Sequence, residues 1–256
     1  NCYFGTGSDT ECVIDPETHE RNKPKKSDVG QASLFADALE QIDFVMSMGN
    51  ARDVPTEISD VHHFQAMVEN TVKPIIFTAW NLDNLKTIVE MARAVAGGTK
   101  KLKDNPFLIH YAEPSPPLQH SREALEKLLF MAREELPIAY VPATMQGATG
   151  PVTIAGSLVQ ANAEVLSGLV ISQLKREGAP FLYGGGIPAM DMSSAIASYT
   201  APESMLGMSA LAEMTHYYNL PLWSYGGCTD SEVFDEQAAA EGVYSLLLAV
   251  LHGGNI

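Results

Sequence analysis

The sequence has little positive charge. Its 256 residues include 16 lysines and arginines against 31 aspartates and glutamates, which gives a formal net charge of −15. Because binding to nucleic acid requires a clustered basic surface, we expect no DNA or RNA partner. The single basic cluster, residues 21–26, contains a proline and is interpreted as a solvated turn. With 46% hydrophobic and 18% charged residues, the chain can bury a large core, which excludes intrinsic disorder.

Long apolar runs and cysteines are also scarce. No uninterrupted apolar run approaches the roughly 18–20 residues that a membrane-spanning helix needs, so we expect a soluble protein without a membrane partner. The three cysteines are an odd number without the paired spacing of a metal site, and no signal peptide is recognisable. These features predict a reduced, cytoplasmic protein.

The common motifs for nucleophilic and metal catalysis are missing. There is no G-x-S-x-G elbow, no H-x-x-x-H pair among the seven histidines, and no cysteine pair. Cys228 lies in a predicted loop, but no histidine is close to it in the sequence. We therefore expect neither a bound metal nor a serine or cysteine nucleophile.

The sequence does contain a repeated alternation of apolar runs and helix-period stretches. Six apolar runs are each followed by a loop and a helical segment, at residues 42–48, 74–78, 106–111, 137–141, 180–183 and 221–224. Five of them begin with proline, which is tolerated at the first residue of a strand but not inside one. The helices are predicted at residues 61–71, 82–95, 122–135, 154–177, 203–218 and 235–251. Before them, residues 11–20 alternate and turn at Asp15-Pro16, which predicts a hairpin.

The alternation predicts an α/β fold with a parallel sheet, either doubly wound or closed into a (β/α)8 TIM-type barrel. The barrel is favoured because no glycine-rich dinucleotide fingerprint opens the first unit and the units recur without a pause. Six β/α units are present, and residues 254–256 read as the opening of a seventh, whereas a closed barrel has eight. We therefore expect one incomplete barrel domain over residues 1–256, with a hairpin insertion at about residues 1–30, truncated at both ends.

Active sites of such folds lie at the C-terminal ends of the strands. Aromatic side chains gather at these predicted ends beside acidic ones: Trp80, Tyr111, Tyr183, Trp223 and Tyr225, with Glu113, Asp191 and Asp230. Aromatic faces beside a carboxylate suit a cation, above all a quaternary ammonium. Each aromatic can instead cap the core, and Tyr183 and Trp223 lie inside apolar runs from which they can point into the sheet.

Other candidates have a structural and a functional interpretation. Gly184, Gly185 and Gly186 are followed by no lysine-serine pair, but their N–H groups can hold a carboxylate, or they simply form a tight turn. Asp235 is a predicted N-cap of the last helix. Glu241 can reach the loop above that helix, although solvation is the favoured interpretation.

Several segments resemble the trimethylamine methyltransferase (MttB) superfamily. They are residues 146–156 (QGATGPVTIAG), 162–166 (NAEVL), 184–192 (GGGIPAMDM), 227–231 (GCTDS) and 235–241 (DEQAAAE), together with 2–9 (CYFGTGSD) and 42–49 (IDFVMSMG). The similarity covers essentially the whole chain, and the combination is specific to the superfamily but not to one substrate.

The resemblance implies a (β/α)8 barrel that moves a methyl group from an amine to the Co(I) of a separate corrinoid protein, an activity of class EC 2.1.1.- in methylamine metabolism and methanogenesis. It also implies that the corrinoid comes with the partner and that no cofactor is bound directly. Founding members carry pyrrolysine, which is absent here, so the glycine betaine type is expected. The alternatives are a pyrrolysine-type trimethylamine enzyme and a noncatalytic binding domain for quaternary amines.

We expect the site residues at the strand ends. The predicted catalytic residues are Glu113 and Asp230; the predicted substrate-binding residues are Trp80, Tyr111, Tyr183, Gly184, Gly185, Gly186, Tyr225 and Gln146; no metal ligand is predicted. The expected partners are a corrinoid protein, a small methylated amine and further copies of the same chain in a homo-oligomer.

Overall fold

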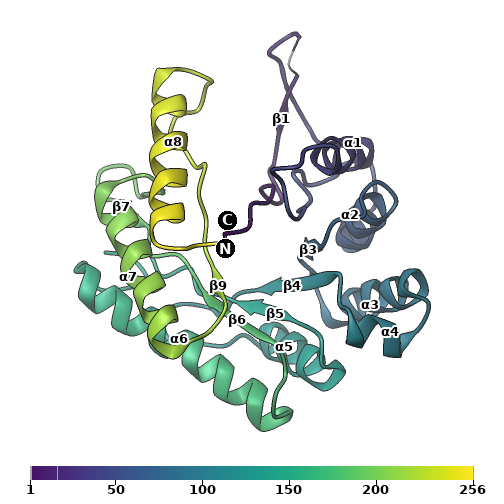
Figure 1. The fold of residues 1–256 in the computed structure, drawn as a ribbon. Coiled ribbons are helices and arrows are strands. Elements are labelled where there is room, and N and C mark those ends of the chain that lie inside the picture. Colours follow the sequence, from purple (N-terminus) through teal and green to yellow (C-terminus); the bar gives the residue numbers. More distant parts are fainter. Residues whose placement is uncertain (1, 16, 256) are drawn as a thin grey trace. The chain divides into compact units, whose positions relative to one another are not determined.

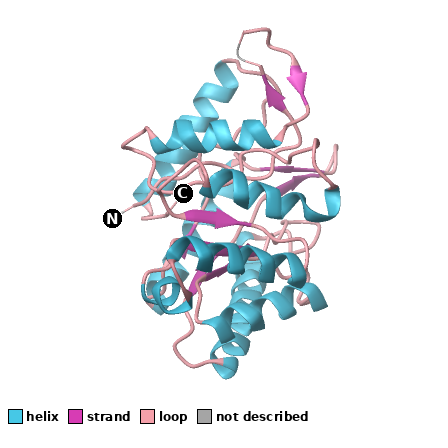
Figure 2. Ribbon diagram, turned by 90° about the vertical axis from the view of Figure 1, so that its right-hand side faces the viewer, coloured by secondary structure: helices cyan, strands magenta, loops and turns pink. Residues whose placement is uncertain are grey.

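The computed structural model describes residues 2–15 and 17–255, which form two compact units. Among the described residues, the N-terminal unit comprises residues 3–15, 17–111 and 134–137, and the C-terminal unit comprises residues 2, 112–133 and 138–255. Both contain short strands and longer helices, magenta and cyan in Figure 2.

The N-terminal unit contains a hairpin and two parallel strands with their helices (Figure 1). Its elements are β1 (Val13–Ile14), β2 (Arg21–Asn22), α1 (Lys26–Asp37), a 3-10 turn (Thr56–Ile58), α2 (Ser59–Val68), β3 (Ile75–Phe77), α3 (Leu82–Ala96), α4 (Thr99–Asp104) and β4 (Leu108–Ala112). β1 and β2 are antiparallel, which confirms the predicted hairpin, although Pro16 of its expected turn lies outside the described residues. Residues 21–26 are not a simple turn, because β2 occupies their start and α1 begins at Lys26.

The first predicted strand, residues 42–48, forms only isolated bridges. Val45 pairs in parallel with Ile75 of β3, and Phe44 with Gly5. At Met46 both backbone groups are hydrogen-bonded to a side chain of the N-terminal segment. Thr6 Oγ1 accepts from Met46 N at 2.7 Å and donates to Met46 O at 3.2 Å. A side chain replaces the backbone ladder here, so no regular strand extends over these residues.

The C-terminal unit continues the same alternation. Its elements are α5 (Arg122–Glu134, ending in the other unit's segment), β5 (Ile138–Tyr140), α6 (Ile154–Lys175), β6 (Phe181–Gly184), β7 (Ala189–Asp191), β8 (Ile196–Ser198), α7 (Pro202–Tyr218), β9 (Leu222–Trp223) and α8 (Glu236–Leu251). β5, β6 and β9 are parallel neighbours, and α6 and α7 pack on β6 (Figure 1). The chain therefore has the α/β class predicted: parallel strands, each followed by helices, as in part of a (β/α)8 barrel.

Prolines mark the joints between helix and strand, as the sequence indicates. Pro74, Pro137, Pro180 and Pro221 each lie directly before a strand. Proline lacks an N–H, but its carbonyl remains an acceptor: Tyr183 N donates to Pro221 O at 2.9 Å, for example. These positions let the chain enter a strand without leaving a buried donor unpaired.

The helices missed by the sequence analysis are short or lined by small residues. α1 packs on α2 with Val29, Gly30, Ser33 and Ala36 buried, a face that gives little hydrophobic periodicity. The six predicted helices are present as α2, α3, α5, α6, α7 and α8, within a few residues of the expected ends.

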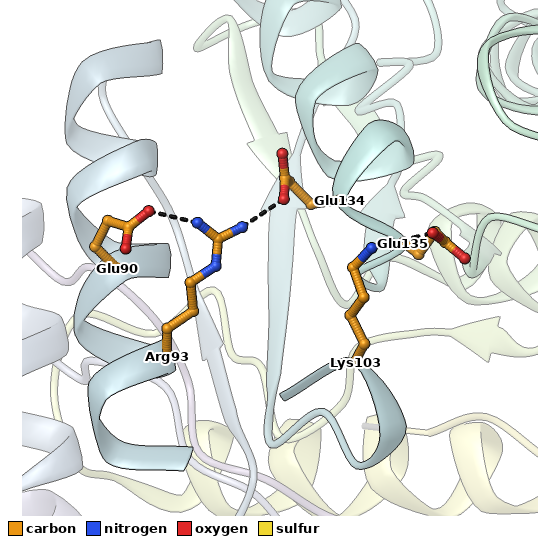
Figure 3. Close-up of polar contacts among 5 residues, drawn as sticks. All are labelled: Glu90, Arg93, Lys103, Glu134 and Glu135. Carbon is orange, nitrogen blue, oxygen red and sulfur yellow. Dashed lines mark hydrogen bonds and ion pairs between the residues drawn. The ribbon is translucent and has the colours of Figure 1, made fainter. Parts of the chain in front are cut away.

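A charged cluster joins α3 and α4 to Glu134, the last residue of α5, and to Glu135, all within the N-terminal unit (Figure 3). The guanidinium of Arg93 lies between Glu90 and Glu134 and pairs with both. Lys103 pairs with Glu135 at 3.1 Å. The side chains of Arg93 and Glu134 are only 19% and 16% exposed, so this pair is less screened by water than an exposed one.

Candidate active site at the strand ends

Asp230 fastens one strand-end loop of the C-terminal unit to another. Its carboxylate accepts from Tyr199 N at 2.9 Å, from Thr200 Oγ1 at 2.8 Å and from the hydroxyl of Ser198. Burial acts to raise the pKa of Asp230, but the donors Ser198, Tyr199 and Thr200 outweigh it and hold the pKa below its ordinary value. The ionised carboxylate of Asp230 thus connects the loop after β9 to the residues just before α7 by hydrogen bonds.

Glu241 of α8 is hydrogen-bonded to the same loop. Its carboxylate accepts from Asp230 N at 2.8 Å and Thr229 Oγ1 at 2.8 Å, and Gln237 donates to it at 2.9 Å. The hydrogen bond from Asp230 N is the largest influence that lowers the pKa of Glu241. The favoured interpretation of Glu241 as a merely solvated acid was therefore wrong. Asp235 caps α8 as predicted, by accepting from Ala238 N at 2.9 Å.

Tyr225 pairs with an aromatic residue that the sequence analysis did not single out. The rings of Tyr225 and Tyr199 lie edge to face, with centroids 5.6 Å apart. The hydroxyl of Tyr225 is buried and has no hydrogen-bond partner among the described residues. Burial, followed by the nearby Cys228, Tyr199 and Asp230, raises the pKa of Tyr225, which keeps the phenol protonated.

Glu113 and Cys228 complete this neighbourhood. Glu113 is exposed in the loop after β4, and its charge contributes to raising the pKa of Tyr199, whose main cause is burial. Burial also raises the pKa of the Cys228 thiol to about 11. A thiol with that pKa is protonated at neutral pH and a poor nucleophile, so Cys228 is not an activated catalytic cysteine. Glu113, Tyr199, Tyr225, Cys228 and Asp230 therefore form one electrostatic cluster at the strand ends.

The three consecutive glycines have a packing role that the sequence could not distinguish from ligand binding. A side chain on Gly184 would place its Cβ 2.1 Å from the carbonyl oxygen of Trp223 in β9. Gly185 has a φ of +141° and lies against Pro142. The N–H of Gly186 already donates to Pro142 O at 2.8 Å, so it is not available to a substrate carboxylate.

Two further predicted binding residues are engaged inside the C-terminal unit. Gln146 is buried, and its amide donates to Ile187 O at 2.8 Å. Tyr183 is fully buried and donates to Asn162 Oδ1 of α6 at 2.7 Å. Asn162 also reaches Tyr218 of α7, so Tyr183 points into the layer between β6 and its helices, as its place in an apolar run allowed.

A buried carboxylate provides a second set of ties. Glu164 of α6 is 2% exposed and accepts from Leu118 N at 2.8 Å, Gln160 Nε2 at 3.0 Å and Thr144 Oγ1 at 3.1 Å. Leu118 and Thr144 follow β4 and β5. Glu164 therefore anchors two more strand-end loops.

Trp80 and Tyr111 belong to the N-terminal unit. Trp80 N donates to Asp60 Oδ2 at 2.8 Å and its indole N–H to Ser59 Oγ at 2.9 Å, while 41% of the residue remains exposed. It lines an open cavity of about 470 Å³ with Glu11, Asn50, Ala51, Arg52, Thr56, Glu57, Ser59 and Asn81. Tyr111 is half-buried in β4, on the strand face opposite the buried His110.

Signals for the missed residues were weak. Tyr199 follows β8, in a β7–β8 hairpin inserted between β6 and α7 that no apolar run announced. Among residues 2–15 and 17–255, no three His, Cys, Asp or Glu side chains are grouped so that they could hold a metal ion. By length and composition α6 is apolar enough to cross a membrane, yet it carries Glu164, whose hydrogen bonds tie it to loops of a folded unit.

Comparisons with known proteins identify the family of the chain. The family described as trimethylamine methyltransferase (MTTB) matches residues 1–256. The chain is 36% identical over 253 residues to a protein named trimethylamine methyltransferase MttB from Desulfitobacterium hafniense (strain DSM 10664 / DCB-2), covering 99% of this chain and 50% of that one.

Two other relatives carry related names. A glycine betaine methyltransferase of D. hafniense (strain Y51) is 31% identical over 82% of this chain and 44% of its own length. A trimethylamine methyltransferase MttB of Methanosarcina barkeri (strain Fusaro / DSM 804) is 30% identical over 98% of this chain and 51% of its own length. The chain thus spans about half the length of the curated relatives it matches, and it belongs to the trimethylamine methyltransferase (MTTB) family.

Proposed function

We propose that this chain forms part of a methyltransferase that moves a methyl group from a quaternary methylated ammonium, such as glycine betaine, to the Co(I) of a corrinoid on a partner protein. The observation that carries the proposal is the cluster of Tyr199 and Tyr225 beside the carboxylates of Asp230 and Glu113. Aromatic faces attract a quaternary ammonium by about 0.5–2 kcal/mol each, depending on desolvation, and carboxylates add to this.

The chemistry asks little of the protein beyond binding and alignment. The C–N bond breaks with its electron pair staying on nitrogen, so the cation leaves as a neutral tertiary amine and needs no proton. Co(I) supplies the electron pair for the new Co–C bond, so the protein needs no nucleophile of its own. The protonated thiol of Cys228 is consistent with such a site.

The residues of this chain would act by positioning. Tyr199 and Tyr225 would hold the cation between ring faces and edges, while Asp230 fixes the loop that carries Tyr199. Holding the reacting methyl group in line is worth several kcal/mol of the barrier in well-oriented reactions, about 7–11 at the upper end. We propose Glu113 as a further negative charge toward the ammonium.

The experiment is methyl transfer by the full-length protein with cob(I)alamin or the cognate corrinoid protein as acceptor. Glycine betaine should yield dimethylglycine in proportion to methylcobalamin formed. Glu113→Gln should raise the KM for the cation with a smaller effect on kcat; unchanged saturation would remove Glu113 from the cation site. Lys86→Gln in α3, a charge change on an exposed residue, is the control.

A second candidate is trimethylamine as the methyl donor. It is favoured by the names of relatives from both Desulfitobacterium and Methanosarcina. If the full gene contains an in-frame amber codon and the protein demethylates trimethylamine but not betaine, this candidate replaces the first. Calorimetric binding of betaine without any methyl transfer would instead indicate a noncatalytic binding domain.

A further inference from the structure

The hydroxyl of Tyr225 is an unusual group in this cluster. It is buried and unpartnered among the described residues, and a buried hydroxyl without a partner is unfavourable by about 1–3 kcal/mol. Most buried polar atoms in folded proteins are paired, so an exception next to a candidate substrate site calls for an explanation.

The groups around Tyr225 have their own partners. The Asp230 carboxylate is occupied by Ser198, Tyr199 and Thr200, and the Gly186 N–H donates to Pro142 O. A Cβ built on Gly186 would lie 3.5 Å from Cε1 of Tyr225, so the absent side chain leaves ordinary van der Waals room beside the ring.

Positive charge is scarce in this part of the chain. Within residues 138–256 the only lysine and arginine are Lys175 and Arg176, at the C-terminal end of α6. The active face of a parallel α/β unit is at the opposite end, where the strands end and the helices begin. The other lysine and arginines of this unit lie on α5, where Arg122 is 87% exposed and pairs with Glu126 at 2.8 Å. The donor that the cluster itself offers to a ligand oxygen is the neutral phenol of Tyr225.

We propose that the Tyr225 hydroxyl selects methylated ammonium ions that carry an oxygen acceptor, a hydroxyl or a carboxylate, over those that carry only alkyl groups. This inference rests on the proposed function. The phenol donates its proton to the ligand oxygen, while the ring and Tyr199 contact the methylated nitrogen. A ligand without an acceptor leaves the hydroxyl unpaired, as it is now.

The test compares three quaternary ammonium ions with the full-length protein: tetramethylammonium, choline and glycine betaine. The measured quantity is kcat/KM for methyl transfer, for the wild type and for Tyr225→Phe, which keeps the ring. We expect Tyr225→Phe to lower kcat/KM about 10- to 100-fold for choline or betaine and to leave tetramethylammonium within about twofold, as loss of one buried hydrogen bond implies. If kcat/KM falls more for choline, the acceptor that Tyr225 selects is a hydroxyl; if it falls more for betaine, the acceptor is a carboxylate.

Tyr199→Phe is the matched control, since it removes the same atom from the neighbouring ring. Tyr199 is 45% exposed, so its variant should leave the ratio between the three substrates unchanged. Equal losses for all three substrates with Tyr225→Phe, or no loss for any, would overturn the inference. If the wild type transfers methyl groups from none of them, the proposed function fails, and calorimetric Kd values decide the inference: Tyr225→Phe must weaken choline or betaine selectively.

Discussion

The two units of this chain use carboxylates for the same task in opposite environments. In the N-terminal unit Asp60, 2% exposed, accepts from Trp80 N and from Asn84 Nδ2, each at 2.8 Å, and burial raises its pKa despite these donors. In the C-terminal unit Asp230 is exposed. Burial acts to raise its pKa, but the hydrogen bonds that it accepts together lower the pKa by more, so the net shift is downward. The comparison teaches that the number of hydrogen bonds does not set the direction of the shift; the balance between donors and lost water does.

The largest effect is expected from the close backbone packing that is found in the C-terminal unit. Gly184→Ala would place a Cβ 2.1 Å from Trp223 O, so β6 and β9 would have to separate. The free energy of unfolding, measured by urea denaturation, should fall by about 3 kcal/mol or more.

Gly242→Ala in α8 is the control, because its Cβ meets nothing within 4 Å. An interior helical glycine replaced by alanine should stabilise by about 0.5–1 kcal/mol. Equal behaviour of the two variants would show that β6 and β9 do not approach as closely as described.

The second-largest loss of stability is expected from removing the buried carboxylate of Asp60 in the N-terminal unit. Asp60→Ala leaves two donors, on Trp80 and Asn84, without their acceptor, so the free energy of unfolding should fall by about 2–4 kcal/mol. Asp83→Ala, whose side chain is 90% exposed, should cost less than about 1 kcal/mol. Tryptophan fluorescence should also report the loosened Trp80; a loss no greater than that of Asp83→Ala would contradict the assigned role of Asp60.

The charged cluster of Figure 3 offers an intermediate case. Arg93→Ala removes the ion pair with Glu134, whose side chain is only 16% exposed, and should reduce the free energy of unfolding by about 2 kcal/mol. The exposed pair of Arg122 and Glu126 is the comparison: Arg122 is 87% exposed, so Arg122→Ala should lower the free energy of unfolding far less than Arg93→Ala does, because water screens the pair. Thermal denaturation of both variants would reveal whether partial burial makes the difference.

The smallest effect concerns pH, where the two aspartates should act in opposite directions. The pKa of Asp230 is lowered in the fold, so its contribution is present above the ordinary value of 3.8 and is lost as the pH falls below it. The pKa of Asp60 is raised, so stability is lost as the pH rises from 3.8 through the folded pKa.

Urea titrations at pH 3 and pH 6 test this. The deficit of Asp230→Asn relative to the wild type should be under about 1 kcal/mol at pH 6 and smaller at pH 3. Asp60→Asn should compare more favourably with the wild type at pH 6 than at pH 3. The same pH trend in both variants would contradict the contrast between the two sites.

Much of the fold could be predicted because its signals are local. The prolines before β3, β5, β6 and β9 and the helical period of α3 and α5 report on the nearest few residues, and the six predicted helices were found. α1 was missed because its buried face consists of small residues, and the β7–β8 hairpin because its pairing depends on two short segments meeting. Whether residues 1–256 form a single barrel domain stays a prediction.

The candidate site was predicted less completely. Strand-end position identified Glu113, Tyr225 and Asp230, which the structure brings into one cluster, but also Tyr183 and Gln146, which point elsewhere. Strand position alone does not tell which face a side chain takes or which backbone group it binds. Tyr199 was missed because its proximity to Tyr225 arises only through the tie made by Asp230.

The sequence by itself determined the alternation of strands and helices, the shortage of positive charge and the family motifs, since these are properties of neighbouring residues and composition. Only the tertiary structure decided which strand-end groups are already paired. Hydrogen-bond partners here lie far apart in the sequence, 31 residues for Asp230 and Tyr199 and 46 for Glu164 and Leu118, and packing selects among many possible partners. That selection leaves the Tyr225 hydroxyl unpartnered among the described residues, while the N–H of Gly186 is engaged.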